Sequence, residues 1–517
     1  MRSVPFTPEM RKEYTILIPN MLPIHWNFVV RIFSFYGYNV EFIDSTDRAI
    51  IDEGLRSVHN DTCYPALLVI GQYLYALRCG KYDPHKVAML YFQTGGGCRA
   101  SNYICLMRKA LDRAGFDYVP ILSINFSGWK NEGGGFKITL PMLPRAMSAL
   151  AYGDLLMLLR NQTAPYEIHK GDSDKLVEKW TEYLCEEFNH GRQLYGSSIK
   201  KTMDKIAAEF EAIERDTKPR VKVGIVGEIY IKYSALGNNN LERFLASEDC
   251  EVMVPGLLDF MLYCVQGGIE AYDLYGGEKM PLYVCRIARR YLEGVKSKII
   301  SAASAHGFTP PSSFTHLTKL VDGIISRGCD MGEGWLLTAE MAELYELGYE
   351  NIICVQPFGC LPNHIVGKGM IRKLREKYPR ANIVPIDYDP GATAVNQENR
   401  IKLMLAVARE HLAQLQSPLS SQPQTDASGQ TDNADACVGS DRESSRNYEF
   451  FPILSKAQKL RKYVQFDEKP PPIRGAALFF VSTVIITTAL KKSINLLCIL
   501  REILLTNIKS DGIIIIA

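Results

Sequence analysis

Short apolar runs alternate with helix-like stretches in the first part of the chain. From about Tyr14 to Gln162, several runs are rich in apolar and β-branched residues and are bounded by turn-forming residues: TILIPN, YNVEFID, VAMLYFQ and YVPILSIN. Between them lie stretches typical of helices, such as 64–79 and 102–114. Strands that alternate with amphipathic helices indicate βαβ units and a parallel sheet. We therefore expect a first α/β domain over residues 14–165.

A charged stretch with helical spacing follows, from about Tyr166 to Asp216. Apolar residues recur there at the period of a helix that packs against a neighbour: Leu176, Val177, Trp180, Leu184 and Phe188. A second series of strand-like runs then begins with VKVGIVGEIYIKY and continues with EVMVPGL, NIICVQPFG and NIVPIDYD. We expect a helical connector over 166–218 and a second α/β domain over 219–411. The predicted fold class is α/β, with two doubly wound parallel-sheet domains.

The chain changes character after about His411. Residues 417–447 are rich in Ser, Gln, Asp and Asn, a composition typical of a disordered linker, which we place over 412–450. Beyond it, residues 475–490 (GAALFFVSTVIITTAL) carry no charge within an atypical apolar tail over 451–517. This run falls short of the roughly 20 residues that a membrane-spanning helix needs. Membrane association through 475–490 is the alternative to a poorly structured tail or a late packing strand.

The bulk composition excludes some classes of protein. A chain of 517 residues predicts two or three domains, and a formal net charge of +2 provides no large field to attract nucleic acid. The N-terminus has no secretory signal, so the 13 cysteines predict a reduced, cytoplasmic protein. We expect most of these thiols to be buried packing groups, including Cys105, Cys185, Cys250, Cys264 and Cys285.

The first motif that could carry chemistry is HNDTCYP, around Cys63, before a predicted helix. A thiol at the start of a helix lies near the positive end of the backbone dipole and near free N–H groups, which favour the metal-binding thiolate. Pro65 suits a first helical turn. The alternative is a plain helix cap by Asp61 or Thr62 beside a buried cysteine.

The second motif is QTGGGCRASNY, directly after the strand-like run VAMLYF. Consecutive glycines at the end of a strand let the backbone approach a ligand and supply N–H groups, where an open α/β sheet has its binding crevice. The motif lacks the lysine and spacing of a phosphate-binding loop. Cys98 therefore indicates a cluster ligand or a nucleophile, and a structural glycine turn is the alternative.

The third motif is QPFGCLPNH, after the strand-like run NIICV. Cys360 follows a turn-forming glycine at a strand end, as Cys98 does. His364 could be a ligand, an acid–base group or an ordinary loop histidine, and we favour the last. Cys354 lies within the strand-like run and is expected to pack in the core.

No CxxC pair occurs among these motifs, so zinc-ribbon and ferredoxin spacings are absent from them. Three thiolates from separate loops can hold three irons of a cubane and leave the fourth iron open to a substrate. Polar residues that could surround such a site include Glu228, Tyr230, Glu333 and the loop 238–240. For each of them, ordinary capping or turn formation is favoured over catalysis.

At these residues the chain resembles the 2-hydroxyacyl-CoA dehydratase family (2-hydroxyglutaryl-CoA dehydratase-like), in the branch related to the C-terminal region of large acyl-CoA dehydratase activase fusion proteins. The strings that carry the resemblance run from about Tyr14 to Leu405, some three-quarters of the chain. They are HNDTCYPALLVIGQ, QTGGGCRASNYICLMRKAL, ALAYGDLLM, GIVGEIYIKYSALGNNNL, GEGWLLTAEM, QPFGCLPNHIVGKG and IDYDPGATAVNQENRIKLM. The tail from about Ser417 lies outside the resemblance.

The resemblance implies two flavodoxin-like or Rossmann-like domains and a 4Fe-4S cluster on three cysteines, here Cys63, Cys98 and Cys360. Relatives carry a double-cubane cluster, which is the alternative cofactor. In the dehydratases, an ATP-hydrolysing activase delivers one low-potential electron to the cluster. A ketyl radical at the thioester carbonyl then permits loss of the 3-hydrogen and the 2-hydroxyl. The resemblance assigns no catalytic residue, and it implies ATP only through a partner.

The fusion proteins place actin-like activase domains before this region, whereas this chain begins almost directly at TILIPNM. We therefore expect an activase that acts in trans on a homo- or hetero-dimer, or a chain that is a fragment of a fusion protein. The favoured hypothesis is an iron–sulfur component of a lyase that dehydrates an acyl-CoA thioester. The alternatives are a double-cubane-type reductase of another small molecule and a non-catalytic iron–sulfur electron carrier or scaffold.

Overall fold

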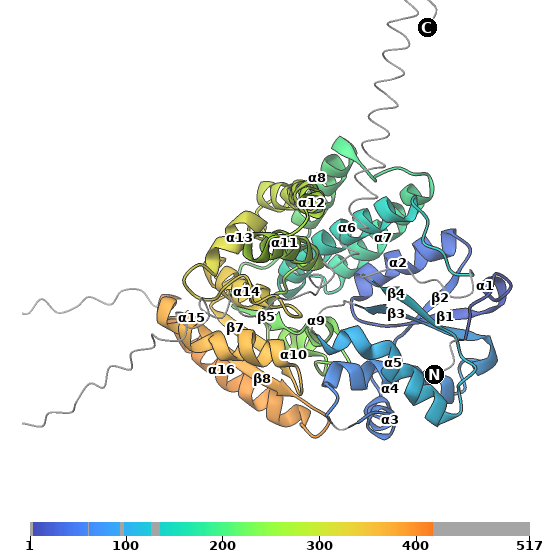
Figure 1. Cartoon of the computed structure of the whole chain (residues 1–517). Coiled ribbons are helices and arrows are strands. Elements are labelled where there is room, and N and C mark those ends of the chain that lie inside the picture. Colours follow the sequence, from blue (N-terminus) through green and yellow to red (C-terminus); the bar gives the residue numbers. More distant parts are fainter. Residues whose placement is uncertain (1–3, 60, 94–97, 126–134, 417–517) are drawn as a thin grey trace, which may run out of the picture. The chain divides into compact units, whose positions relative to one another are not determined.

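The computed structural model describes residues 4–59, 61–93, 98–125 and 135–416 (Figure 1). The described residues up to Glu410 belong to one compact unit, and a second unit begins at His411, within the last helix. Residues 412–416 of the predicted linker continue that helix. The rest of the linker and the apolar tail, including 475–490, lie outside the described residues.

The first half of the compact unit is built on a parallel sheet of four strands in the order β2-β1-β3-β4. Its strands are β1 (Thr15–Pro19), β2 (Asn39–Ile43), β3 (Val87–Gln93) and β4 (Ile121–Asn125). Its helices are α1 (Met10–Glu13), α2 (Pro23–Phe35), α3 (Ala49–Ser57), α4 (Tyr64–Arg78) and α5 (Tyr103–Ala114), with the 3-10 turns η1 (Pro84–Lys86) and η2 (Arg99–Asn102). The apolar runs of the sequence thus form the predicted strands.

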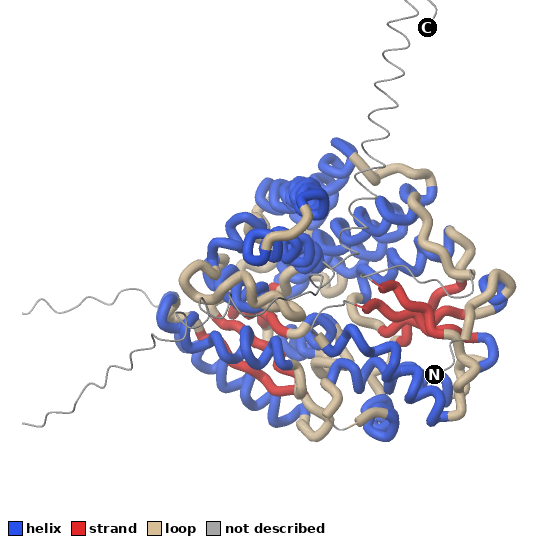
Figure 2. Tube along the Cα trace, in the orientation of Figure 1, coloured by secondary structure: helices blue, strands red, loops and turns tan. Residues whose placement is uncertain are grey.

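The second half repeats this arrangement with another parallel sheet of four strands, in the order β6-β5-β7-β8. Its strands are β5 (Val221–Gly227), β6 (Cys250–Met253), β7 (Asn351–Pro357) and β8 (Asn382–Tyr388). Its shorter helical elements are α9 (Ile229–Tyr233), α10 (Leu241–Ser247), α14 (Trp335–Glu346), η4 (Asn363–Gly367), η5 (Lys368–Met370), α15 (Ile371–Lys377) and α16 (Ala394–Gln416). Figure 2 shows the two sets of strands, and the predicted α/β class is confirmed.

Long helices pack together in a region that carries much of the apolar core. They are α6 (Met142–Thr163), α7 (Asp172–Asn189), α8 (Gly196–Glu211), α11 (Leu257–Tyr275), α12 (Lys279–Ala305) and α13 (Phe314–Leu320), with the turn η3 (Ala164–Tyr166). Helix α6 contacts α8, α11 and α12, so helices from before and after β5 share one layer. Among the described helices, the segment Met142–Tyr166 is long and apolar enough to cross a membrane, but 83% of its most apolar window is buried. The segment is therefore a helix of the protein core.

One strand prediction is wrong at its C-terminal end. The apolar sequence after Val221 continues through IYIKY, yet β5 ends at Gly227 and the next residues form the short helix α9. Gly227 has φ +143°, and a Cβ there would lie 2.3 Å from the carbonyl oxygen of Val355. The side chain of Glu228 then accepts a hydrogen bond from the Ile231 N–H and caps the helix. The backbone geometry at Gly227 and the cap from Glu228 therefore outweigh the preference of the sequence IYIKY for a strand.

Hydrogen bonds join the two halves near the start of α4. The Tyr64 N–H donates to the carbonyl oxygen of Phe358 over 3.0 Å. The hydroxyl of Tyr230 donates to the side-chain oxygen of Gln72 over 2.8 Å, and both groups are buried. These contacts bring the N-terminus of α4 to the loop after β7. In parallel sheets such strand-end loops form the binding crevice.

Candidate metal centre

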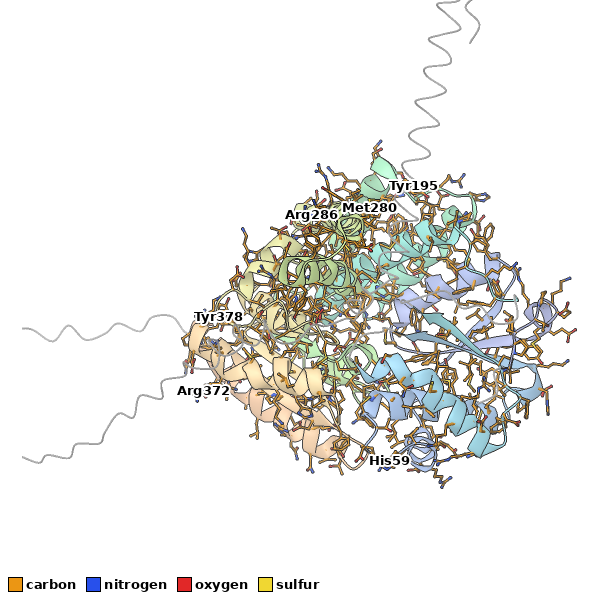
Figure 3. The ribbon with its side chains drawn as sticks, viewed as in Figure 1. His59, Tyr195, Met280, Arg286, Arg372 and Tyr378 are labelled. Atoms are coloured by element: carbon orange, nitrogen blue, oxygen red, sulfur yellow. The ribbon has the colours of Figure 1, made fainter. Side chains whose placement is uncertain are left out.

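Cys63 lies immediately before α4, as its N-terminal capping residue, with φ −60° and ψ 146°. Its side chain is buried with 5% exposure, in a small apolar cluster with Ala66 and Tyr103. The helix begins here because Pro65 occupies its first turn, where its missing N–H leaves no hydrogen bond unmade. His59, at the start of the same motif, lies on the surface of the molecule (Figure 3).

Cys98 precedes the short turn η2, between β3 and α5, with an extended backbone at φ −74° and ψ 147°. Its thiol is half-buried. Its carbonyl oxygen accepts hydrogen bonds from the backbone N–H of Ser101 over 3.1 Å and from the Ser101 hydroxyl over 2.7 Å. These bonds fix the backbone at the cysteine. The glycines at 95–97, which the motif analysis singled out, lie outside the described residues.

Cys360 follows β7 through a tight turn, and its side chain is 8% exposed. Gly359 adopts φ +72°, and a Cβ there would lie 3.1 Å from the Cα of Cys63. A side chain at this position would therefore press against the backbone that carries the first thiol. The glycine permits the close approach of two segments that are far apart in the sequence.

The three thiols lie in one electrostatic environment. Burial raises the pKa of the Cys98 thiol to about 11, and the charges of Glu333, Glu228 and Cys63 raise it further, while the N–H of Ala100 opposes them. Burial also raises the pKa of Cys360, with added contributions from Glu333, Glu228 and Cys98. The geometry brings the same segments together, because Gly359, next to Cys360, packs against the backbone of Cys63, and the hydroxyl of Tyr103, five positions after Cys98, lies 3.0 Å from the sulfur of Cys63. The structure thus brings together the cysteines that the sequence analysis singled out.

Two buried carboxyl groups lie beside these thiols, and both bind the first turn of α9. Glu228 accepts a hydrogen bond from the Ile231 N–H over 2.9 Å, and Glu333 accepts one from the Ile229 N–H over 3.0 Å. Burial, followed by the negative charge of Glu333, raises the pKa of Glu228 to about 8, against the N–H groups of α9 and the charge of Lys232. Burial and the charge of Glu333 thus both disfavour the ionised form of Glu228.

Lys232 does not by itself balance the negative charge of Glu228 and Glu333, because its ammonium group pairs with another carboxyl group. Its ammonium group forms a buried ion pair with Glu340 on α14, with N–O distances of 3.1 and 3.2 Å. The two side chains are only 6% and 1% exposed. Buried carboxyl groups therefore accompany the buried ammonium group of Lys232 in this region, at Glu228, Glu333 and Glu340.

The donor chemistry of the candidate ligands fits an iron–sulfur cluster, because such clusters are held by cysteine thiolates. The described cysteines are free thiols, so no disulfide between them competes for the candidate ligands. Among the described residues, no group of three His, Cys, Asp or Glu side chains is placed to hold a metal ion.

The other residues from the sequence analysis have structural roles. Asn238 donates to the carbonyl oxygens of Ile231 and Lys232 and caps α10, so the loop 238–240 is held by local hydrogen bonds. His364 is exposed but lies within the short helical element η4, so it is a surface histidine and not the expected loop histidine. Cys354 is fully buried in β7.

The thiols expected to pack in the core differ in how exposed they are. Cys185, Cys250 and Cys285 are buried, whereas Cys264 is half-buried and Cys105 is exposed. Cys105 lies on the outer face of α5, because the inner face of that helix is formed by Tyr103, Met107, Ala110 and Leu111. Helical position, which composition alone does not reveal, decides between the two outcomes.

Tyr103 is a site residue that the sequence analysis did not single out. Its hydroxyl lies 3.0 Å from the sulfur of Cys63 within the buried cluster. The string QTGGGCRASNYICLM places it five positions after Cys98, at the start of a predicted helix, where an aromatic residue reads as core packing. No sequence pattern connects it with a cysteine on another helix.

No protein-family model and no curated protein matches this chain. The resemblance to the 2-hydroxyacyl-CoA dehydratase family therefore stays a prediction.

Proposed function

We propose that the chain is a cytoplasmic iron–sulfur protein whose Cys63, Cys98 and Cys360 hold a 4Fe-4S cluster. The observation that carries the proposal is the approach of the segments that bear these thiols, two from the first half and one from the second. Gly359, next to Cys360, packs against the backbone of Cys63, and Tyr103, five positions after Cys98, lies at hydrogen-bond distance from the Cys63 sulfur. The cluster would accept a low-potential electron from an ATP-hydrolysing activase acting in trans. The reaction proposed is the radical dehydration of a 2-hydroxyacyl-CoA thioester or a related reduction.

The chain's own residues have distinct parts in this proposal. The three thiols would bind the cluster, which supplies one-electron chemistry when bound. The apolar surroundings of Cys63, with Ala66 and Tyr103, exclude water from its sulfur. Burial raises the pKa of Glu228 above its ordinary value, so this carboxyl group would be able to bind or release a proton as the charge of the centre changes.

Quantifying iron and acid-labile sulfide after anaerobic purification tests the proposal. We expect about four irons per chain for a single cubane, and about eight would favour the double-cubane alternative. The Cys98→Ala variant should lose most of this iron. A matched control is Cys285→Ala, which removes another buried thiol on α12 and should retain full occupancy. A metal-free wild-type protein, or full iron in Cys98→Ala, would overturn the assignment.

A second measurement separates the reaction from mere electron carriage. Reduced protein is mixed with acyl-CoA thioesters, and the spectrum of the cluster is recorded. A change on adding a 2-hydroxyacyl-CoA supports the dehydratase proposal. An unchanged spectrum with every thioester favours the reductase of another small molecule or the electron carrier.

A further inference from the structure

A small buried cluster surrounds the sulfur of Cys63, separate from the main apolar core. It contains Cys63, Ala66 and Tyr103, with the ring of Tyr91 packed against it. The rings of Tyr91 and Tyr103 lie 5.4 Å apart at an angle of 41°. Tyr103 is only 4% exposed, as the first residue of α5. Water therefore has little access to its hydroxyl.

The hydroxyl of Tyr103 and the sulfur of Cys63 form a buried hydrogen bond of 3.0 Å. A thiolate that binds iron has no proton to give, so in the loaded protein the hydroxyl donates and the sulfur accepts.

The environment makes this bond stronger than a surface contact. A donor buried away from water costs free energy unless it is paired, so the hydroxyl is held toward its acceptor. The neighbouring ring of Tyr91 and the start of α5 fix the orientation of Tyr103. The sulfur of Cys63 is in turn fixed by its place at the N-terminus of α4. Both partners belong to rigid elements of the first half.

We infer that Tyr103 is a positioning residue that raises the reduction potential of the centre through its hydrogen bond to the sulfur of Cys63. The inference rests on the proposed function, since it requires a cluster on that thiol. A hydrogen bond to a ligand sulfur draws electron density from the iron, and so stabilises the reduced, more negative state of the cluster. A negative charge on the nearby carboxyl groups Glu228 and Glu333, when they are ionised, acts in the opposite direction.

The Tyr103→Phe variant tests this inference in the full-length, anaerobically purified protein. The variant keeps the ring and removes the donor, so its iron content should equal that of the wild type. Its midpoint potential, from a redox titration followed by electron paramagnetic resonance, should be more negative. An exchangeable proton coupled to the reduced cluster, seen by electron–nuclear double resonance in the wild type, should disappear.

The matched control is Tyr73→Phe. Tyr73 is also fully buried, but its hydroxyl bonds the carbonyl oxygen of Leu90 on β3. This control should lose stability without changing the potential or the exchangeable proton. If Tyr103→Phe fails to assemble a cluster, replacing Tyr103 by 3-fluorotyrosine gives the opposite test. Its stronger donor should make the potential more positive.

The outcomes separate the two proposals. Absence of iron from the wild-type protein overturns the proposed function. A loaded wild type and a loaded Tyr103→Phe variant with equal potentials and equal proton couplings overturn the role of Tyr103 alone. An equal shift in Tyr73→Phe would also overturn it, because the effect would then come from general loosening of the core.

Discussion

The two α/β halves share a strand order but place different side chains at corresponding positions. The third strand of each sheet ends in a loop with a candidate thiol, Cys98 after β3 and Cys360 after β7. The helices that lead toward these strands differ. Helix α4 starts directly after Cys63, whereas α14 starts after Glu333 and Gly334. The second half thus has a carboxyl group where the first half has its other thiol.

The surroundings of Cys63 and Glu333 also differ, because Cys63 lies among apolar groups and Glu333 lies among ionisable groups. Cys63 lies among apolar groups and shares a hydrogen bond with the hydroxyl of Tyr103. Glu333 lies beside Glu228, with the buried pair of Lys232 and Glu340 behind them. We interpret the N-terminus of α4 in the first half as the part that holds the sulfur of Cys63 away from water. The second half, on this interpretation, closes the site and supplies groups that exchange protons.

The largest expected effect comes from removing the one candidate thiol of the second half. Cys360→Ala should reduce the iron content of the anaerobically purified protein to a small fraction of the wild-type value. Cys354→Ala, which removes a fully buried thiol from the preceding strand, should leave the iron content unchanged. Equal iron contents in the two variants would show that the second half does not contribute a ligand.

The carboxyl groups of the second half should make the stability of the metal-free protein depend on pH. Burial raises the pKa of Glu228 from 4.5 to about 8, so the folded state binds this proton more tightly than the unfolded state. The contribution of Glu228 to the free energy of unfolding should therefore be fully present below about pH 4.5 and be lost as the pH rises through about 8. Urea denaturation at a series of pH values measures this.

The Glu228→Gln variant should flatten that dependence, because glutamine cannot ionise. Part of the slope should remain, since burial also raises the pKa of Glu343 to about 7. The exposed Glu376 on α15 provides a control, and Glu376→Gln should change nothing. A Glu228→Gln variant with the full wild-type slope would show that Glu228 ionises in the folded protein as it does in water.

A substitution at Gly359 tests how closely the two halves approach each other. Its φ of +72° disfavours any side chain, and a Cβ would lie 3.1 Å from the Cα of Cys63. Gly80 has a similar φ of +77° with nothing within 4 Å of a Cβ. Gly80→Ala should therefore lose only the conformational contribution, about 1 kcal/mol, and Gly359→Ala should lose more and bind less iron. Thermal or urea unfolding of both variants decides this, and equal losses would contradict the close approach.

The smallest expected effect comes from the hydrogen bond between the halves at Tyr230. Tyr230→Phe leaves the buried oxygen of Gln72 without this donor and should lower the free energy of unfolding by about 1 kcal/mol. The exposed Tyr283 on α12 provides the control, and Tyr283→Phe should have little effect. If both variants unfold alike, the bond does not stabilise the junction.

Much of the fold could be predicted from the sequence. The strands are short apolar runs bounded by turns, and each candidate thiol follows or precedes such an element, which is why Cys63, Cys98 and Cys360 could be singled out. The shared strand order could not be predicted, because pairing between strands leaves little mark on composition. Helix α9 was missed because IYIKY favours strands by composition, and the backbone at Gly227 overrides that preference.

The details of the candidate site are harder to predict from the sequence than the fold is. Glu333 was expected to cap the helix that follows it, but its carboxyl group instead accepts the Ile229 N–H of a helix far earlier in the chain. Tyr103 reads as a packing residue, and only the folded chain brings its hydroxyl to a sulfur on another helix. Long-range contacts of this kind depend on how the two halves meet, which no local pattern encodes.

The placement of Cys63 and Gly359 against each other has a consequence for how the protein is made. The first sheet, with two of the three thiols, leaves the ribosome long before the loop that carries the third. At ordinary rates of synthesis this interval lasts on the order of tens of seconds. During that time the nascent chain has two of the three candidate ligand thiols and lacks the third. We therefore expect metal insertion to follow translation, once the second sheet has folded against the first.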